Sequence, residues 1–219
     1  MALAIFDLDN TLIAGDSDNL WGKFLCDEGL VDAESYSRHN DQFYSDYQAG
    51  TLDIDAYLRF ALSSLIGVSA AQRNHWHQSF MQRMIEPILL PAANTLLEKH
   101  RKAGDELLII TATNRFITEP IAALLGVDNL IACEGEIIDG VYTGKPAGTP
   151  SYADGKVVRL QRWLKGREIE LNGAWFYSDS HNDLPLLKIV DHPVAVDPDD
   201  TLREIALKRD WTIISLRDQ

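Results

Sequence analysis

The sequence predicts an α/β protein with a doubly wound parallel sheet at its core and a four-helix cap inserted after the first strand. Short apolar runs recur along the chain, and helical stretches separate most of them, which is typical of a sheet covered on both faces. Between residues 17 and 85 no strand signal occurs, and this gap is much longer than a crossover helix requires. We therefore expect a Rossmann-like core of residues 1–14 and 86–219 and a helical cap of residues 15–85.

Five apolar runs have the composition of buried strands. They lie at residues 2–6, 106–110, 174–177, 194–196 and 212–216. Two further runs, 133–138 and 141–143, flank Asp139 and Gly140, a dipeptide that readily adopts the positive φ angles of a tight turn. We expect these two runs to form an antiparallel hairpin that interrupts the alternation of strands and helices.

Helical spacing of apolar residues predicts two helices of the core, at 91–103 and 155–164. The same spacing occurs four times in the cap segment, where three stretches end before Gly29, Gly50 and Gly67 and the fourth surrounds Phe80. A small helical bundle needs aromatic side chains to close its core. We therefore interpret most aromatic residues of the cap as packing residues rather than as a platform for a ligand.

The composition excludes several kinds of partner. The chain has 219 residues, 46% of them hydrophobic, and a formal net charge of −13 at pH 7. A chain this acidic repels nucleic acid and anionic membrane surfaces, so we expect neither as a partner. Two cysteines are too few for a disulfide framework, and we see neither a leader nor a membrane-spanning run. These features favour a cytoplasmic protein, and they leave its oligomeric state open.

Acidic and hydroxyl side chains follow three of the predicted strands. Asp7 and Asp9 follow the first strand, Thr111 follows the second, and Asp179 and Asp183 follow the third. The carboxyl ends of parallel strands share one edge of a sheet, so these residues should meet in one crevice. Four carboxylates packed together raise one another's pKa unless a cation lies among them, and an all-oxygen site suits Mg²⁺. The sequence therefore predicts a magnesium site.

Four motifs of the chain resemble those of the haloacid dehalogenase superfamily, in the order that this superfamily requires. The segment 7–11 resembles its first motif, 109–111 its second, Lys156 its third and 177–184 its fourth. The helical insertion after the first motif resembles the cap of the phosphoserine-phosphatase-like branch. The resemblance spans the chain and implies a Mg²⁺-dependent phosphomonoesterase that acts on a small phosphorylated metabolite.

The resemblance also implies roles for the four carboxylates. Asp7 would attack phosphorus and carry a phosphoaspartate intermediate. Asp9 would protonate the leaving alkoxide and then deprotonate the attacking water. Mg²⁺ would be held by Asp7, by the backbone carbonyl of Asp9 and by Asp179, with Asp183 reaching it directly or through water.

Thr111 and Lys156 would bind the phosphoryl oxygens, and each has a rival nearby. We prefer Thr111 to Thr113 because Thr111 is the first polar residue after its apolar run. The resemblance favours Lys156 over Lys145 because Lys156 opens a helix shortly before the third motif-bearing strand.

Other functions fit less of the sequence. A phosphoacceptor signalling domain also clusters carboxylates, Thr and Lys at the ends of parallel strands, but it needs no helical insertion after its first strand. A dehalogenase needs neither a leaving-group acid nor a metal cluster, whereas Asp9, Asp179 and Asp183 are all present. A mutase stays open, because the sequence does not indicate the lifetime of a phosphoenzyme.

The cap is expected to select the leaving group. Asp16 lies where phosphoserine phosphatases carry an acidic residue that meets the substrate amine. Asp16 and Asp18 are also the acids nearest in sequence to the catalytic loop that could accept a hydrogen bond from a ring of the substrate, although both could simply cap a helix. The chain more closely resembles bacterial phosphatases of this branch that act on histidinol phosphate. We therefore expect histidinol phosphate as substrate, with its imidazole stacked on Trp21 or Tyr47, and phosphoserine as the alternative. The cap arginines that could bind a substrate carboxylate lack the context expected for that role: Arg38, Arg59, Arg73 and Arg83.

Overall fold

The computed structural model describes residues 2–217, and at its centre lies a seven-stranded sheet with the strand order β4-β3-β2-β1-β5-β6-β7. Neighbouring strands pair in parallel except β3 and β4, which are antiparallel. The predicted α/β fold class is confirmed. The strands are β1 (Leu3–Phe6), β2 (Glu106–Asn114), β3 (Asn129–Ile138), β4 (Val141–Ala147), β5 (Trp175–Ser178), β6 (His192–Val196) and β7 (Thr212–Ile214).

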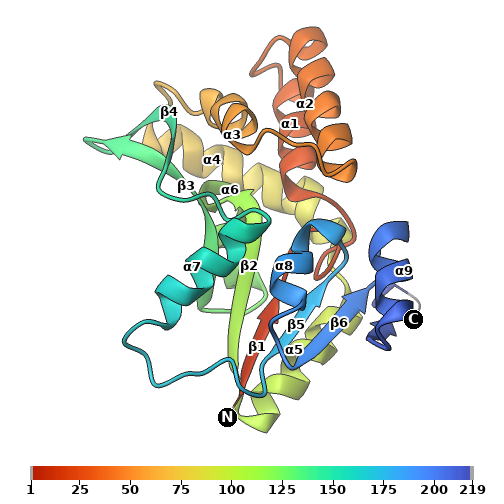
Figure 1. Ribbon diagram of the computed structural model, residues 1–219. Helices are drawn as coiled ribbons and strands as arrows, with labels where there is room; N and C mark the ends of the chain where they lie inside the picture. Colours follow the sequence, from red (N-terminus) through yellow and green to blue (C-terminus); the bar gives the residue numbers. More distant parts are fainter. Residues whose placement is uncertain (1, 218–219) are drawn as a thin grey trace.

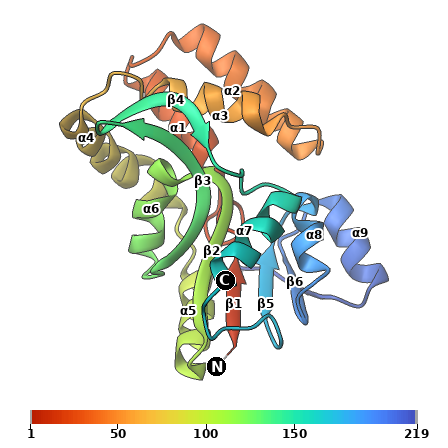
Figure 2. The same ribbon diagram turned by 60° about the vertical axis from the view of Figure 1, so that its left-hand side comes forward.

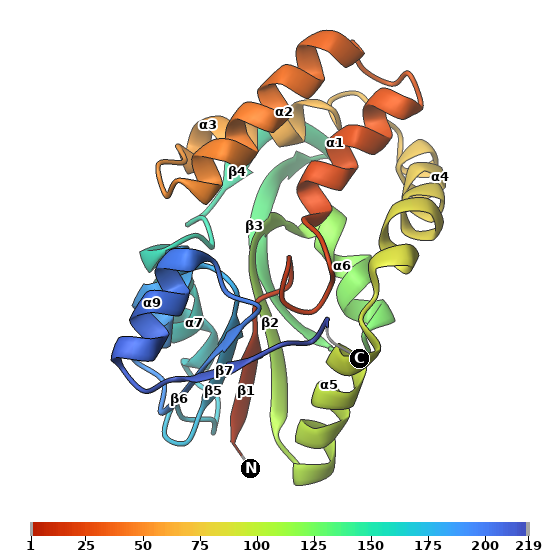
Figure 3. The same ribbon diagram turned by 90° about the vertical axis from the view of Figure 1, so that its right-hand side faces the viewer.

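Helices cover both faces of the sheet, so the central strand β1 is buried on both sides. Leu3 and Ile5 face one layer, while Ala4 and Phe6 face the other. The first layer contains α7 (Asp154–Leu164), α8 (Leu184–Leu187) and α9 (Asp200–Lys208), and the second contains α5 (Pro91–Ala103) and α6 (Arg115–Leu124). Figure 3 shows α7 and α9 on one side of the sheet and α5 and α6 on the other. Within residues 2–217, no helix has the length and apolar character needed to cross a membrane.

The sequence analysis identifies no helix where α6 lies. Pro120 is inside this helix, and proline normally interrupts a helix because it lacks an N–H and clashes with the preceding turn. Ile117 and Ile121 on the same helix are nevertheless fully buried. Packing of this apolar face against the sheet overrides the local signal.

Strands β2 and β3 are longer than the sequence predicts. β2 continues past Ile110 to Asn114 through an irregularity in its pairing, and β3 begins at Asn129 rather than at Cys133. The first part of β3 pairs with β2 and the last part with β4. The sequence pattern predicts only the part of β3 that belongs to the hairpin, because that part ends in a clear turn signal.

The predicted cap is present as four α-helices between β1 and α5, lying over the carboxyl end of β1 (Figures 1 and 2). Each helix begins after a side chain that accepts a hydrogen bond from a backbone N–H of the first turn, a cap that contributes about 1 kcal/mol. These residues are Asp16, Asp32, Asp53 and Ser69. The helices are α1 (Ser17–Asp27), α2 (Ala33–Gln48), α3 (Ile54–Ser63) and α4 (Ala70–Phe80), followed by a π-helical turn (Met81–Ile85) and a 3₁₀ turn (Glu86–Ile88). The division into domains at residues 14/15 and 85/86 stays a prediction.

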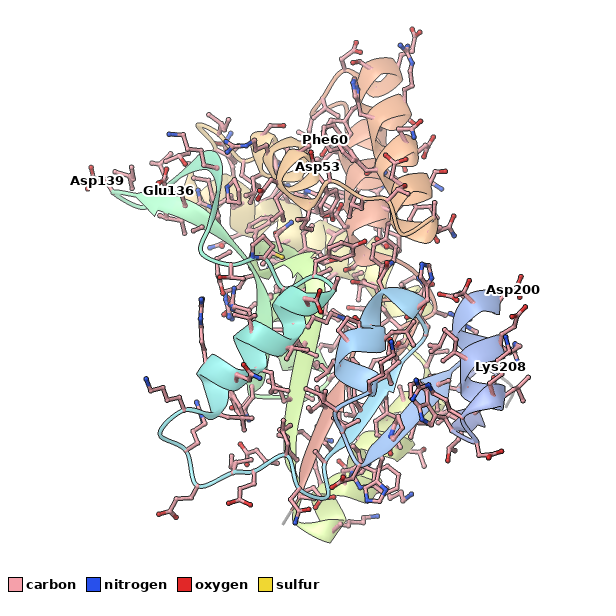
Figure 4. All side chains as sticks on the ribbon, viewed as in Figure 1. Asp53, Phe60, Glu136, Asp139, Asp200 and Lys208 are labelled. Carbon is pink, nitrogen blue, oxygen red and sulfur yellow. The ribbon has the colours of Figure 1, made fainter. Side chains whose placement is uncertain are left out.

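Aromatic side chains of the cap belong mainly to the packed interior, as the sequence predicts. The ring centroids of Phe24, Phe80 and Phe116 lie 5.1 to 5.4 Å from that of Trp21. This cluster joins the core of the sheet without a break. Figure 4 shows Phe60 inside the cap, where its ring packs 4.4 Å from that of Tyr36.

The predicted hairpin is formed by β3 and β4. Asp139 and Gly140 adopt φ angles of 51° and 78°, as the tight turn requires. Figure 4 shows Asp139 at the tip of the hairpin, which projects from the body of the molecule. Nearer its base, the hairpin packs against α3, so β4 also supports the cap.

The first turn of α7 leaves no room for a side chain at Gly155, the residue before Lys156. A Cβ at this position would come 2.1 Å from the carbonyl oxygen of Pro150, a backbone atom that cannot turn away. We predict that Gly155→Ala lowers Tm by several degrees, because the backbone must shift at a cost of about 1–3 kcal/mol. Thermal unfolding measures this effect, with Val158→Ala on the exposed side of α7 as the control. A Gly155→Ala protein as stable as the wild type would contradict the packing described here.

Candidate active site

A buried ammonium group joins the first, third and fourth motifs at the carboxyl edge of the sheet. Asp7 follows β1, and Lys156 comes from the first turn of α7. The Nζ of Lys156 donates to Oδ1 of Asp7 at 2.7 Å and to Oδ2 of Asp183 at 2.8 Å. The Ser178 hydroxyl also donates to Asp183, at 2.7 Å. These three charged side chains are almost completely shielded from solvent.

The charges of this cluster are strongly coupled. Burial and the neighbouring carboxylates Asp183 and Asp9 raise the pKa of Asp7 to about 7, while Lys156 opposes the rise. Burial disfavours the ammonium form of Lys156, but Asp183 and Asp7 together raise its pKa above the usual range. Burial and the charges of Asp7 and Asp183 also raise the pKa of Asp179 well above its ordinary value. The crevice therefore holds more negative charge than one lysine neutralises.

Asp179 is tied directly to the first motif. The Thr11 hydroxyl donates to Oδ1 of Asp179 at 3.2 Å, and the Asp179 backbone N–H donates to the same hydroxyl at 3.1 Å. This pair of hydrogen bonds holds the loop after β5 against the loop after β1. The four predicted carboxylates thus come together from two neighbouring strands.

The carboxylate of Asp9 points toward the cap side of the crevice. Its Oδ1 accepts from the Ser17 backbone N–H at 2.7 Å, and its Oδ2 accepts from the hydroxyls of Thr113 at 2.9 Å and Thr111 at 3.3 Å. Both threonines lie where β2 loses its regular register with β3, between Ile110 and Asn114. A bulge of this kind re-aims side chains, here toward Asp9.

Thr113 is a site residue that the sequence analysis set aside. Its hydroxyl is the closer of the two threonine donors to Asp9, and its backbone N–H donates to the Thr111 hydroxyl at 3.1 Å. The spacing of two residues was an available signal, because alternate residues of an extended strand share one face.

The donor set fits a hard divalent cation in part. Asp7 is buried and Asp179 half-buried, and the pKa of each is raised by burial and by the neighbouring carboxylates, whose repulsion a divalent cation would relieve. Asp183 is occupied by Lys156 and Ser178, and the Asp9 carboxylate faces the threonines. The backbone carbonyl oxygen of Asp9 is therefore the atom that Asp9 can still offer to a cation. Within residues 2–217, no three Asp, Glu, His or Cys side chains form a ready metal site by themselves.

A cavity extends from Asp7 and Asp9 into the cap. It encloses about 490 Å³ of space free of atoms, part of it open to solvent. Four of its lining residues are carboxylates, and the part of the chain that the structure describes contributes no Lys, Arg or His to the lining. The lining residues are Asp7, Asp9, Asp16, Asp18, Asn19, Asn40, Phe43, Tyr44, Tyr47, Leu52, Tyr57, Thr111, Ala112 and Thr113.

The two cap acids predicted from the sequence both line this cavity but differ in their contacts. Asp16 is the N-cap of α1, and its Oδ1 accepts from the Asn19 backbone N–H at 2.8 Å. Asp18 is only 6% exposed, does not cap the helix, and accepts from Asn114 Nδ2 at 3.4 Å. Burial raises the pKa of Asp18 to about 7, although a hydrogen bond from Tyr57 opposes the rise. Burial and the charges of Asp9 and Asp18 raise the pKa of Asp16 well above its ordinary value.

Trp21 is not available to stack on a ligand, which corrects one of the two sequence-based candidates. Its side chain is 1% exposed and is enclosed by the aromatic cluster described above. Tyr47, the other candidate, does line the cavity. Periodicity along α1, which carries Trp21, and α2, which carries Tyr47, could not separate the two, because both inward-facing packing and cavity lining produce buried aromatics.

None of the four cap arginines lines the cavity. Arg38 and Arg83 form ion pairs with Glu34 and Glu28, respectively, on the surface. Arg73 donates to the backbone carbonyls of the loop before α4 and of the hairpin turn. Arg59 is exposed on α3.

Hydrogen bonds beside the fourth motif also join the cap to the core. Asn182 Nδ2 donates to the backbone carbonyl of Tyr47 at 2.9 Å, and the Tyr152 hydroxyl donates to Asn182 Oδ1 at 3.1 Å. The end of α2 is therefore fixed to the loop that carries Asp183. His181 in the same loop is held by Asp199 through its Nδ1 at 2.8 Å.

Comparison with known proteins gives close relatives along the whole chain. Residues 4–188 match the family model described as haloacid dehalogenase-like hydrolase. A histidinol-phosphatase of Neisseria meningitidis serogroup C (strain 8013) is 46% identical over 219 residues, covering 98% of this chain and 99% of that protein. A phosphoserine phosphatase of Mycobacterium tuberculosis (strain ATCC 25618 / H37Rv) is 29% identical, covering 99% of this chain and 71% of that protein.

Solved structures share the fold. A Bordetella pertussis Tohama I protein of unknown function has a TM-score of 0.92 and 43% identity, with 98% of each chain covered. A substrate-bound phosphoserine phosphatase has a TM-score of 0.72 and 17% identity, covering 99% of this chain and 93% of that one, a likeness that shows the fold alone. Because the family model spans most of the sequence, the family indicated by the four motifs and the prediction of an enzyme are confirmed: this chain belongs to the haloacid dehalogenase-like hydrolases.

Proposed function

We propose that this hydrolase is a Mg²⁺-dependent phosphomonoesterase that forms a phosphoaspartate on Asp7 and acts on histidinol phosphate. The substrate assignment rests on the lining of the cavity. Among the residues that the structure describes, this lining combines aromatic rings and four carboxylates and includes no Lys, Arg or His. Such a lining suits a cationic leaving group with a flat ring. The 46% identity to a histidinol-phosphatase supports the same substrate.

Asp7 is placed to act as the nucleophile. One of its oxygens is held by Lys156, and Asp7 also lines the cavity, so an oxygen can reach a phosphoryl group bound there. Attack forms the Asp7 O–P bond and breaks the bond between phosphorus and the substrate oxygen. Water then attacks phosphorus, breaks the O–P bond to Asp7 and releases inorganic phosphate.

Asp9 is the group that moves protons. Its carboxylate lines the cavity between Asp7 and the cap, where the leaving oxygen of a bound phosphomonoester would lie. In the first step Asp9 gives its proton to the leaving alkoxide, and in the second it takes a proton from the attacking water. The Ser17 N–H and the Thr113 hydroxyl fix the orientation of this carboxylate.

Lys156 and Thr111 bind the phosphoryl oxygens in this proposal. The ammonium group of Lys156 steadies Asp7 and stabilises negative charge that develops on the phosphoryl group. The Thr111 hydroxyl donates to Asp9 at 3.3 Å in this structure, a long hydrogen bond. To reach a phosphoryl oxygen, the hydroxyl turns away from Asp9, while Thr113 keeps Asp9 in place.

The residues proposed to hold Mg²⁺ are Asp7 and Asp179 with their side chains and Asp9 with its backbone carbonyl. When bound, the ion supplies positive charge next to the phosphoryl group. Asp183 acts on the ion indirectly, because its carboxylate holds Lys156 in place and accepts a hydrogen bond from Ser178. The excess of buried carboxylate charge supports this assignment.

Phosphoserine is the second candidate substrate. It shares with histidinol phosphate a phosphate on a primary carbon near an ammonium group, which Asp16 could bind in either case. It differs in carrying a carboxylate, and an unpaired buried carboxylate costs several kcal/mol. Among residues 2–217, the cavity lining offers no Lys, Arg or His side chain to pair with it.

The proposed function makes a prediction about the metal. We expect activity to require Mg²⁺, to vanish with a chelator and to return when Mg²⁺ is added back. We expect Ca²⁺ to inhibit, because its looser and higher coordination lets a carboxylate bind it bidentately and misorients Asp7. Steady-state assays with metal-stripped protein measure both effects. Full activity after exhaustive chelation would remove Mg²⁺ from the proposal.

The proposed function also makes a prediction about the substrate. We expect a specificity constant at least about tenfold higher for histidinol phosphate than for phosphoserine. The free-energy cost of leaving the phosphoserine carboxylate unpaired in the cavity is large enough to produce a difference of this size. The two substrates are compared at neutral pH with saturating Mg²⁺. A higher value for phosphoserine would replace the proposed substrate with the second candidate. If neither substrate reacts, the substrate class inferred from the cavity lining is wrong.

A further inference from the structure

The two acids of the cap cavity are not equivalent. The backbone N–H of Ser17, the residue after Asp16, donates to Asp9 at 2.7 Å, which places Asp16 near the reacting end of the cavity. Asp18 instead accepts a hydrogen bond from the Tyr57 hydroxyl, and Asn114 also donates to it at 3.4 Å. Asp18 therefore lies where three elements meet: α1 of the cap, α3 of the cap and the end of β2.

Asp18 is held more rigidly than a surface carboxylate. It is 6% exposed, and the Asn114 side chain that donates to it is itself fixed, because its Oδ1 accepts from the Ile117 backbone N–H as the N-cap of α6. Two donors leave the carboxylate with acceptor capacity to spare, since it can accept about four hydrogen bonds. The reaction at Asp7 makes no use of that capacity.

The surroundings of Asp18 suit a flat ring. Phe43 and Tyr57 line the same cavity, and their rings pack edge to face with centroids 5.8 Å apart. Phe43 also packs against Phe60, at 5.3 Å, so its position is fixed from behind. An aliphatic ammonium group gains little from such walls, whereas an aromatic N–H donor can use the walls and the carboxylate together.

We propose that Asp18, oriented by Asn114 and Tyr57, accepts a hydrogen bond from the ring N–H of the substrate's imidazole. This inference rests on the proposed function and assigns its specificity to a set of side chains. Tyr57 and Asn114 act as positioning residues, because they contact Asp18.

The pKa values of Asp18 and of an imidazole are compatible with a hydrogen bond between them. Burial raises the pKa of Asp18 to about 7, close to the value of about 6.5 for a free imidazole. Near neutral pH, Asp18 and the ring can therefore share a single proton. The other charged groups that act on Asp18 and Tyr57 are Asp9 and Asp16, and both disfavour a second negative charge nearby.

A cycle that combines one variant with one substrate change tests this assignment. The ring N–H is removed by replacing histidinol phosphate with phenylalaninol phosphate, which keeps the ammonium group and a flat ring. The carboxylate is removed by Asp18→Asn. We expect the wild type to prefer histidinol phosphate, and the ratio of the two kcat/KM values to fall at least about tenfold in Asp18→Asn, as for loss of a charge-assisted hydrogen bond.

Tyr57→Phe provides a second variant that keeps the ring packing. It should lower the same ratio by about threefold, since it removes one donor that orients Asp18. Asp41→Asn, on an exposed position of α2, and Tyr36→Phe, in the cap but outside the cavity lining, are the matched controls and should leave the ratio unchanged. Circular dichroism checks that each variant is folded.

The outcomes separate the two proposals. A wild type that hydrolyses histidinol phosphate while Asp18→Asn and Tyr57→Phe both keep the wild-type ratio overturns the role of Asp18 and leaves the proposed function intact. If Asp18→Asn fails to fold, the ratio measured with Tyr57→Phe decides. A wild type that does not hydrolyse histidinol phosphate overturns both the proposed function and this inference.

Discussion

The arrangement of this active site depends on one buried contact, the ammonium group of Lys156 between Asp7 and Asp183. A charge buried this deeply is stable only with well-placed partners, and removing one partner of such a pair typically costs about 3–5 kcal/mol. The contact requires that the loops after β1 and β5 and the first turn of α7 all reach the same point. The central position of β1 beside β5 and the bare backbone at Gly155 both serve this requirement.

The same contact leaves the site short of positive charge. One lysine faces Asp7, Asp183 and the nearby Asp179, and the cavity beyond them adds Asp9, Asp16 and Asp18. Carboxylates in such numbers repel one another and favour ligands that bring cations. In our account, Mg²⁺ meets this need at the reacting end, and a doubly basic substrate meets it in the cap. Catalysis and specificity then share one electrostatic cause.

Much of the fold could be predicted from the sequence, because its strands are short apolar runs with clear ends and its cap is a long segment without strand character. Asp7 and Asp179 could be placed because each follows a recognisable strand, and Lys156 because it lies at the start of a recognisable helix. The positions that could not be predicted depend on contacts between distant elements. Proline inside α6 conceals a helix that only packing stabilises, and the irregular end of β2 turns Thr113 toward Asp9. Tyr57 reaches Asp18 across two helices, and no local pattern indicates such a pairing.

The central claim is that Asp7 carries the phosphoryl group during turnover, and the most direct test is to trap it. Wild-type protein is mixed with substrate and Mg²⁺, quenched in acid within a single turnover and digested, and the peptides are examined by mass spectrometry. We predict one added phosphoryl group on the peptide that contains Asp7, and neither label nor turnover in a folded Asp7→Asn protein, because the amide keeps the shape of the side chain but lacks the nucleophilic oxygen. Phosphorylation of a different residue, or normal hydrolysis by Asp7→Asn, would contradict the account.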